Sequence, residues 1–472
     1  MMSGRAARDA PPGPRCCIPA RVRANHGCPH PGESAARGRE AGCGGAAARK
    51  DAGGGRFMAR RAGRGREGAW GAIILLACAP ALAQERAPRA TLDETGLTVR
   101  GPDDAVRFEL GGRLHADFGA GGSRALTNEF PVAADLRRLW IEPKLTFGRN
   151  LILNLQYDPA SAATPINNLL LSYKGAPVAA GMPSWTLTVG NFKEPFSLEQ
   201  LISNNDTTFM ERSLADTFAP GRDTGLALGT HGRNWTLAAG VYGGNVNADV
   251  GRGGVAGTLR ATAAPILAQD RVLHLGIAGS YRGLDRGGPA LSFGTTPESV
   301  LFRESLVDTD VIAQARAVGR LGLEAAWAQG PLRVQAEVIA TRVERTAGRD
   351  VAFRGGYVYA AWVVNGKAPR YVVEADTATE IGLFKRVAPE GGQRVSRGGP
   401  GVVELAVRVA AVDLTDRDIR GGRQRDVTVG VNWYPEPFLR VMANYVHAWA
   451  DPAATGRPAE AEIGQVRLQI AF

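Results

Sequence analysis

Residues 189–226 read VGNFKEPFSLEQLISNNDTTFMERSLADTFAPGRDTGL. Alternating apolar and polar residues from Trp185 to Val189 predict a β-strand before this stretch, and Gly225 to Gly229 predict another strand after it. More than twenty residues between the two strands have no strand pattern and are rich in Asn, Asp, Glu and Ser. A long insert at this point of an up-and-down barrel is the expected site of a loop that folds inward and narrows a pore.

The N-terminal part of the chain is predicted to lie outside the folded protein. Residues 1–57 are rich in Arg, Gly, Ala, Pro and Cys and lack a hydrophobic period, so we interpret them as a disordered or over-translated leader. Residues 58–83 are interpreted as a signal peptide, with a basic start, a short apolar segment and a small-x-small cleavage site at Ala81 to Ala83. A lipobox that ends at Cys78, with lipidation of this cysteine, is the alternative.

Removal of this leader changes what the composition implies. Residues 1–83 hold 14 of the 56 Lys and Arg and 5 of the 46 Asp and Glu, which leaves 42 basic and 41 acidic side chains. A nearly neutral chain gives no reason to expect nucleic acid as a partner. All five cysteines precede residue 84, so the sequence predicts neither a disulfide framework nor a cysteine-type metal site, and no cofactor.

Strand-like alternation recurs from residue 111 to the end of the chain, and it ends with Val466, Leu468, Ile470 and Phe472 on one face. An aromatic residue that closes an alternating strand is typical of the last strand of an outer-membrane barrel. We count about sixteen strands, an even number as in single-chain bacterial barrels. Fourteen or eighteen remain alternatives, because residues 367–401 are long although they fall on the side with short turns.

The predicted fold is an all-β, transmembrane, antiparallel up-and-down barrel in the outer membrane of a Gram-negative bacterium. Residues 84–110 are expected to form a periplasmic segment or first strand, residues 111–472 the barrel, and residues 194–222 an inward-folded third external loop. A soluble sandwich or propeller is the alternative, since alternation also describes strands with one buried face. Polar residues on the inward face, outward aromatic residues near strand ends and the lack of a blade-length repeat argue against it.

The quoted stretch resembles the signature segment of the phosphate-selective porin family (O/P type). Other segments are similar to this family as well: 135–138 to its paired arginines, 362–367 to a Thr-Gly-Glu-like element, and 403–408, 430–434 and 442–446 to its C-terminal strands. The resemblance implies a sixteen-stranded homotrimeric channel for phosphate or related anions. Asn168 stands where the family leads us to expect Asp, and Asn365 and Lys367 replace the Thr and Glu of the second element.

The candidate anion path consists of arginine and lysine side chains. Arginine suits phosphate because its planar fork makes two parallel hydrogen bonds and keeps its charge. Parity places Arg113 and Arg138 on the inner wall together with Arg282, Arg333, Arg408, Arg440 and Arg467, and the family resemblance adds Arg137. Lys193 points toward lipid by strict parity unless the strand ends before Pro195. The selected residues are Arg113, Arg137, Arg138, Lys193 and Arg222.

The constriction loop contributes Glu194, Asn204, Asn205, Asp206, Phe209, Glu211 and Arg212. Its carboxylates outnumber its cations, so we expect salt bridges to fix the loop while the wall arginines set the anion preference. A salt bridge of Lys193 with Glu194 or Glu211 that only pins the loop is an alternative for that residue. The wall arginines have an alternative explanation as well. They can reflect a compositional bias, 50 Arg against 6 Lys, and form an ordinary mixed-charge wall with no role in selectivity.

The sequence therefore predicts a passive porin that favours anions, with phosphate or polyphosphate as solutes. A general, weakly selective porin is one alternative, and a barrel without a channel, in an adhesive, structural or enzymatic role, is another. No G-x-S-x-G element occurs and the histidines of the mature chain are scattered singly, so we predict no enzyme. The expected partners are small anions such as phosphate, outer-membrane lipid and further copies of the chain in a homotrimer.

Overall fold

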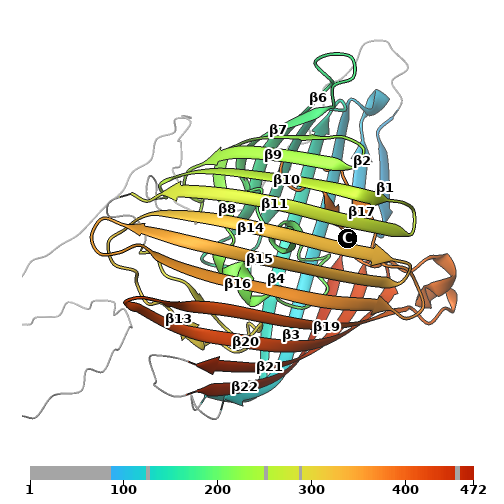
Figure 1. Ribbon diagram of the computed structural model, residues 1–472. Coiled ribbons are helices and arrows are strands. Elements are labelled where there is room, and N and C mark those ends of the chain that lie inside the picture. The colour runs from blue at the N-terminus through green and yellow to red at the C-terminus, as the bar shows by residue number, and fades with distance from the viewer. Residues whose placement is uncertain (1–86, 124–127, 249–252, 286–289, 452–457) are drawn as a thin grey trace, which may run out of the picture. The chain divides into compact units, whose positions relative to one another are not determined.

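The computed structural model describes residues 87–123, 128–248, 253–285, 290–451 and 458–472. The predicted leader (1–57) and signal peptide (58–83) lie outside the described residues. None of the helices in the described part of the chain is long and apolar enough to cross a membrane. Almost all of the described regular structure is β-strand (Figure 1).

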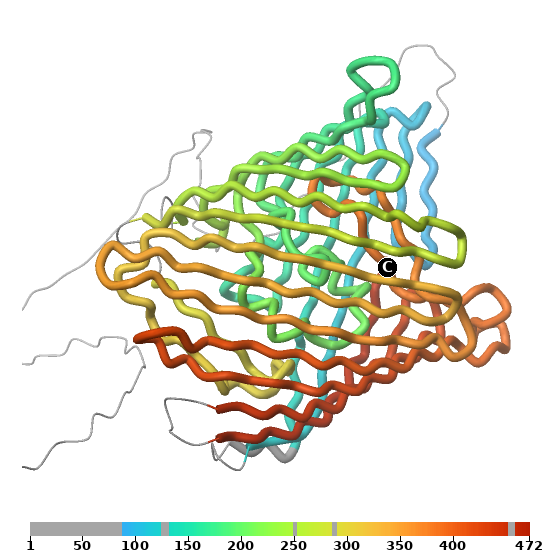
Figure 2. The backbone as a smooth tube through the Cα atoms, in the orientation of Figure 1, coloured from blue at the N-terminus to red at the C-terminus, as the bar shows by residue number. Residues whose placement is uncertain are grey.

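Sixteen antiparallel strands form a closed barrel (Figures 1 and 2), which confirms the predicted fold class and strand count. Closure occurs where the last strand pairs with the first barrel strand, for example Arg467 opposite Asp117. The strands are β3 (Val106–Ser123), β4 (Asn128–Phe147), β5 (Leu151–Tyr157), β6 (Ile166–Gly175), β7 (Trp185–Lys193), β8 (Arg222–His231), β9 (Trp235–Tyr242), β10 (Val255–Leu267), β11 (Arg271–Gly283), β14 (Ala315–Gln329), β15 (Leu332–Arg345), β16 (Val351–Val363), β19 (Val402–Asp416), β20 (Ile419–Glu436), β21 (Leu439–Asp451) and β22 (Ala459–Ala471).

The two faces of the wall have the polarity of a membrane barrel. In β22 the exposed face carries Val466 and Leu468, while Gln465, Arg467 and Gln469 are buried on the inner face. The largest fully buried side chains of the protein include five arginines, Arg260, Arg333, Arg408, Arg440 and Arg467. A soluble sandwich has the opposite arrangement, with apolar residues inside, because burying unpaired charges is costly. The outward aromatic residues Tyr157, Tyr173, Trp433, Tyr445 and Trp449 are exposed as predicted.

The barrel begins earlier than the predicted boundary at residue 111. β1 (Arg89–Asp93) and β2 (Gly96–Arg100) form a hairpin, followed by the short helix η1 (Pro102–Asp104). β2 then pairs with the first residues of β3, from Arg107 to Leu110. This part of β3 extends beyond the end of β22, which pairs with β3 only from Arg113 onward. The hairpin thus covers an edge that would otherwise have unpaired backbone groups.

Two connections need separate description. Residues 415–425 are mostly strand, because β19 and β20 stay paired up to Asp416 and Ile419. Residues 364–401 contain no barrel strand. They form the two-residue strands β17 (Tyr371–Val372) and β18 (Leu383–Phe384), which pair with each other, and the helices η3 (Gly391–Gln393) and η4 (Val395–Arg397). The alternatives of fourteen or eighteen strands are therefore wrong.

Three connecting segments fill much of the barrel. The first, 194–221, carries α1 (Leu198–Leu201) and η2 (Leu214–Phe218). The second, 284–314, carries β12 (Gly294–Thr295) and β13 (Val307–Asp308) and packs its Phe293 and Phe302 into the same apolar cluster as Phe218 and the wall residue Phe353. The third, around 371–388, enters from the end at which the chain terminates. Figure 2 shows the first of these segments as the green tube inside the wall.

Candidate functional site: a constriction inside the barrel

The loop 194–221 turns inward at the end of β7. Alternation stops there, because Asn191, Phe192 and Lys193 are all buried in succession. Ser197 then adopts a positive φ of 65° and its hydroxyl accepts a hydrogen bond from the Gln200 amide, which starts α1 inside the barrel. Strict parity, which points Lys193 toward lipid, is therefore wrong at this position, because the alternation of β7 is already broken at Asn191, after Gly190 with its positive φ of 126°.

The wall formed by β15 and β19 to β22 holds the loop through its backbone. The Glu337 carboxylate accepts hydrogen bonds from the amides of Leu198 (3.0 Å) and Glu199 (2.6 Å). Three more wall side chains bind the loop, namely Arg440 to the Thr207 carbonyl at 2.7 Å, Asn432 to the Thr208 carbonyl at 2.8 Å, and Asn444, which accepts from the Met210 amide at 2.9 Å. Buried backbone groups need such partners, so this wall fixes the path of the loop.

Buried arginines add charge to this attachment. Arg408 lies between Glu199 of the first segment (3.0 Å) and Glu298 of the second (2.6 Å). Arg467 binds Asp117 with both ends of its fork at 2.6 Å, binds Glu211 at 2.6 Å, and donates to the Met210 carbonyl. The prediction that the wall arginines point inward is therefore correct. Most of the groups they contact belong to the loops, so these arginines position the constriction.

The paired arginines of β4 also contact the loop. A register shift between His115 and Ala116 lets Arg137 and Arg138, adjacent in sequence, both approach the interior. Arg137 binds the Glu211 carboxylate with two hydrogen bonds of 3.1 Å, and Arg138 lies 4.0 Å from the same carboxylate. Burial acts to raise the pKa of Glu211, but Arg137, Arg467 and Arg138 outweigh burial and hold this pKa well below its usual range.

The two remaining predicted arginines lie on β3 and at the start of β8. Arg113 stacks over Trp140 at 4.1 Å and binds Glu142 with both ends of its fork, at 2.5 and 2.7 Å. Arg222 also lies over Trp140, at 5.6 Å, and its Nε donates to the Asn168 side-chain oxygen at 2.8 Å. An amide partner orients the guanidinium of Arg222 without neutralising it, whereas Glu142 compensates the charge of Arg113.

Lys193 joins the first and third inward segments. Its ammonium donates to the carbonyls of Leu201 (2.9 Å) and Ile202 (3.3 Å), and it lies 3.4 Å from the Glu380 carboxylate. The partner expected from sequence, Glu194 or Glu211, is therefore wrong. Glu194 instead binds Arg282 at 2.6 Å.

The third segment brings carboxylates to the few lysines of the chain. Asp376 lies 3.3 Å from Lys144 and 2.9 Å from Lys174, and Glu374 lies 3.4 Å from Lys174. Burial acts to raise the pKa of Asp376, but Lys144 and Lys174 outweigh burial and lower this pKa. Sequence reasoning missed the acidic residues of this segment. The available signal was the length of 367–401 on the side with short turns, together with its acidic residues.

The other loop residues have mostly structural contacts. Asn204 accepts a hydrogen bond from Arg212 at 2.8 Å, and Arg212 also donates to the carbonyls of α1. Asn205 lies 3.1 Å from His115 Nε2. Phe209 packs edge-on against Tyr359 and lies under Arg408 at 4.3 Å. Asp206 faces Lys385 of the third segment at 3.8 Å.

Two hollows lie beside the inward segments. A hollow of about 310 Å³ lies between the first and second segments and is lined by Arg212, Asp216, Thr217 and Glu298 among others. Another, of about 580 Å³, lies within the connection 364–402 and includes Lys367, Arg370 and Arg386. The first hollow therefore has a mixed-charge lining, with Glu211, Asp216 and Glu298 beside Arg212, whereas the second is mainly basic. The described residues hold no group of three or more His, Cys, Asp or Glu suited to a metal ion.

A family model for the phosphate-selective porins O and P matches residues 108–472. The chain belongs to this porin family. Porin O of Pseudomonas aeruginosa is 26% identical over 414 residues, which cover 80% of this chain and 91% of the relative. An uncharacterized protein of Caulobacter vibrioides is 27% identical over 388 residues, which cover 77% of this chain and 74% of the relative.

Solved structures of outer-membrane channels also match the porin. The channel DcaP of Acinetobacter baumannii matches with a TM-score of 0.49 and 10% identity, over 78% of this chain and 98% of that chain. An anion-selective porin from Comamonas acidovorans matches with a TM-score of 0.48 and 10% identity, over 78% and 100%. Family membership places this porin in the outer membrane of a Gram-negative bacterium, as predicted.

The porin's anion preference is expected to rise as pH falls from about 7 to about 5. Burial raises the pKa of Asp216 to about 6, with Arg212 acting in the opposite direction. Glu199, Lys193 and Glu211 also act on this carboxyl. Below pH 6 Asp216 becomes neutral and no longer compensates the charge of Arg212, 3.9 Å away. The lining of the hollow between the first and second segments then becomes more positive. Reversal potentials in a salt gradient measure the shift.

The Asp216→Asn variant is the control for this titration. Its anion preference should change less between pH 7 and pH 5 than that of the wild type, because position 216 no longer carries a charge at either pH. An unchanged pH dependence in this variant would assign the titration to another group.

Proposed function

We propose that the porin is a passive diffusion channel that favours small anions such as phosphate, and that the path passes between the loop 194–221 and the wall near Arg222. One observation carries the proposal. Arg222 is oriented by the neutral Asn168 and by Trp140, so its charge remains available to a passing ion. Glu380 and Glu142 act electrostatically on the same position, and so do the cations Arg212 and Arg113.

Phosphate suits such a site. An anion in a narrow channel must exchange part of its hydration shell for protein donors and must then leave again. A guanidinium offers parallel N–H donors that match two phosphate oxygens. The Nη groups of Arg222 are the donors that its hydrogen bond through Nε leaves for this purpose. Carboxylates close by, such as Glu142 and Glu380, weaken the attraction enough for release.

Replacement of Arg222 by Gln is expected to weaken phosphate block of the chloride current by about tenfold, the loss of roughly one charge-assisted hydrogen bond. Single-channel recording in a planar bilayer under a KCl gradient, with added phosphate, measures this effect. Asn168→Asp should also weaken phosphate block. This variant keeps Arg222, but the new carboxylate neutralises the charge of the arginine.

Arg342→Gln is the matched control, since Arg342 is exposed on the outer surface and pairs with Asp350 at 2.8 Å. Its phosphate block should equal that of the wild type. A cation-favouring reversal potential in the wild type, with no block by phosphate, would refute the proposal. Equal losses in all three variants would favour the general, weakly selective porin.

Two further parts of the proposal concern assembly and chemistry. We infer a homotrimer from membership of the family, and chemical cross-linking of the purified porin tests this state. Solutes pass by diffusion along the inner wall, and no covalent step is involved. Arg408 and Arg467 are engaged by carboxylates and a loop carbonyl, so neither is proposed as an anion ligand.

A further inference from the structure

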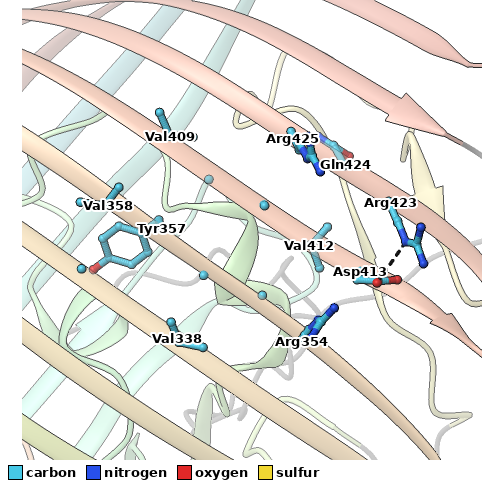
Figure 3. A pocket seen from close by; sticks show the side chains of 15 residues that line it. Val338, Arg354, Tyr357, Val358, Val409, Val412, Asp413, Arg423, Gln424 and Arg425 are labelled. Atoms are coloured by element: carbon cyan, nitrogen blue, oxygen red, sulfur yellow. Dashed lines mark hydrogen bonds and ion pairs between the residues drawn. The ribbon is translucent and has the colours of Figure 1, made fainter.

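The outward face of the barrel has a depression that the channel does not use. It has a volume of about 770 Å³ and lies on β15, β16, β19 and β20 (Figure 3). Gly356 and Ala411 form its floor, because neither has a side chain that fills the space. Val338, Val358 and Val409 border it on the apolar side, and all three are exposed. Their exposure shows that the depression faces away from the pore.

The strand register orders the depression in three rows. Arg354, Asp413 and Arg423 lie opposite one another in the first row, on β16, β19 and β20. The second row consists of Gly356, Ala411 and Arg425, and the third of Val358, Val409 and Val427. A charged edge, a hollow of small residues and an apolar edge thus follow one another over a few residues of each strand.

The charges along this edge are unbalanced. Asp413 pairs with Arg423 at 3.1 Å. Arg354 and Arg425 are exposed, and within the described residues neither takes part in an ion pair or a side-chain hydrogen bond. Arg425 lies opposite Trp449 of β21, so it is level with an outward aromatic residue. Arginine on the lipid face of a barrel costs free energy that grows with depth, and an anionic partner offsets this cost.

We propose that this depression binds a phosphate-bearing lipid of the surrounding bilayer. One acyl chain lies over Gly356 and Ala411 against the valines of the apolar border, Val338, Val358 and Val409. The phosphate pairs with Arg354 and Arg425. The apolar side distinguishes this site from one for free phosphate, which needs no acyl groove. The surplus of arginine makes a second copy of the chain the less fitting occupant, because the same face of a copy brings the same positive charge. Basic pockets beside apolar surface are typical of lipid head-group sites.

Native mass spectrometry of the purified porin tests the proposal, with phosphatidic acid as the probe and diacylglycerol of the same acyl chains as its phosphate-free match. We expect the wild type to retain phosphatidic acid and to lose diacylglycerol. The double variant Arg354→Gln, Arg425→Gln should bind phosphatidic acid about tenfold more weakly. Ala411→Leu should weaken binding as well, because the leucine fills the floor while both arginines remain.

Two controls keep the result interpretable. Arg316→Gln removes an exposed arginine of β14 that pairs with Glu344 at 2.7 Å, and its lipid binding should match the wild type. Arg354→Lys, Arg425→Lys keeps both charges and should retain most of the binding, which separates loss of the site from loss of folding. Folding of every variant is checked by heat-modifiable migration on a gel.

Three results would overturn the proposal. Equal binding of phosphatidic acid to the wild type and the double glutamine variant would show that the arginines are not the site. Displacement of the lipid by inorganic phosphate at equal concentration, with no effect of Ala411→Leu, would indicate a site for free phosphate only. A change of oligomeric state in the double variant, in the absence of lipid, would assign the depression to contact between copies.

Discussion

Arg467→Met is expected to lower the free energy of unfolding by about 3–5 kcal/mol, the typical cost of removing one partner from a buried ion pair. The guanidinium of Arg467 is 1% exposed and compensates two carboxylates, Asp117 across the closing seam of the barrel and Glu211 on the loop. Methionine fills similar space but leaves both carboxylates without this partner. The loop also loses the hydrogen bond at the Met210 carbonyl, so the pore should widen.

Thermal unfolding in detergent and single-channel conductance measure the two effects. Arg440→Met is the matched control on the neighbouring strand β21, because Arg440 donates to the Thr207 carbonyl and to Gln469 and not to a carboxylate. We expect its cost to be about 1–2 kcal/mol. If both variants lost equal stability, the buried carboxylates would not be the cause. If Arg467→Met kept wild-type conductance, the arginine would not position the loop.

The barrel could be predicted from sequence because a simple physical pattern repeats along the chain. Val466 and Leu468 facing lipid, with Arg467 between them facing the interior, need only the two-residue period of a strand. The closure of the sheet by β22 and β3 follows from an even number of such strands. The strand predicted from Trp185 onward is found as β7, which begins at the same residue and ends shortly before Pro195.

The contacts inside the barrel could not be predicted in the same way. Parity places Arg408 and Arg467 on the inner wall, but it does not say that loop carboxylates from far along the chain, Glu199 and Glu211, bind them. Arg137 reaches the interior only because of a register shift in β4, which has no clear mark in the sequence. Lys193 and Glu380 are separated by most of the barrel in sequence, and their contact depends on two loops that enter from opposite ends.

Glu380→Gln is expected to strengthen phosphate block of the chloride current by about tenfold, roughly 1.4 kcal/mol of additional anion binding. Burial acts to raise the pKa of Glu380, but Lys193, Arg222 and Lys385 outweigh burial and lower this pKa, so the carboxylate is ionised at neutral pH. It therefore competes with a passing anion for cations at the constriction. Glutamine keeps the shape and removes the charge, and single-channel recording with increasing phosphate measures the change.

Glu390→Gln provides the comparison, since it removes the same charge just after the third segment, at the N-cap of η3, and within the described residues Glu390 forms no ion pair with a lysine. Phosphate block should be unchanged in this variant. Addition of Glu374→Gln and Asp376→Asn to Glu380→Gln should strengthen block further, because Lys144 and Lys174 are released as well. If Glu380→Gln weakened block instead, the carboxylate would be required to hold Lys193 in place. The third segment would then act as a brace for the constriction, and its carboxylates would not compete with the anion.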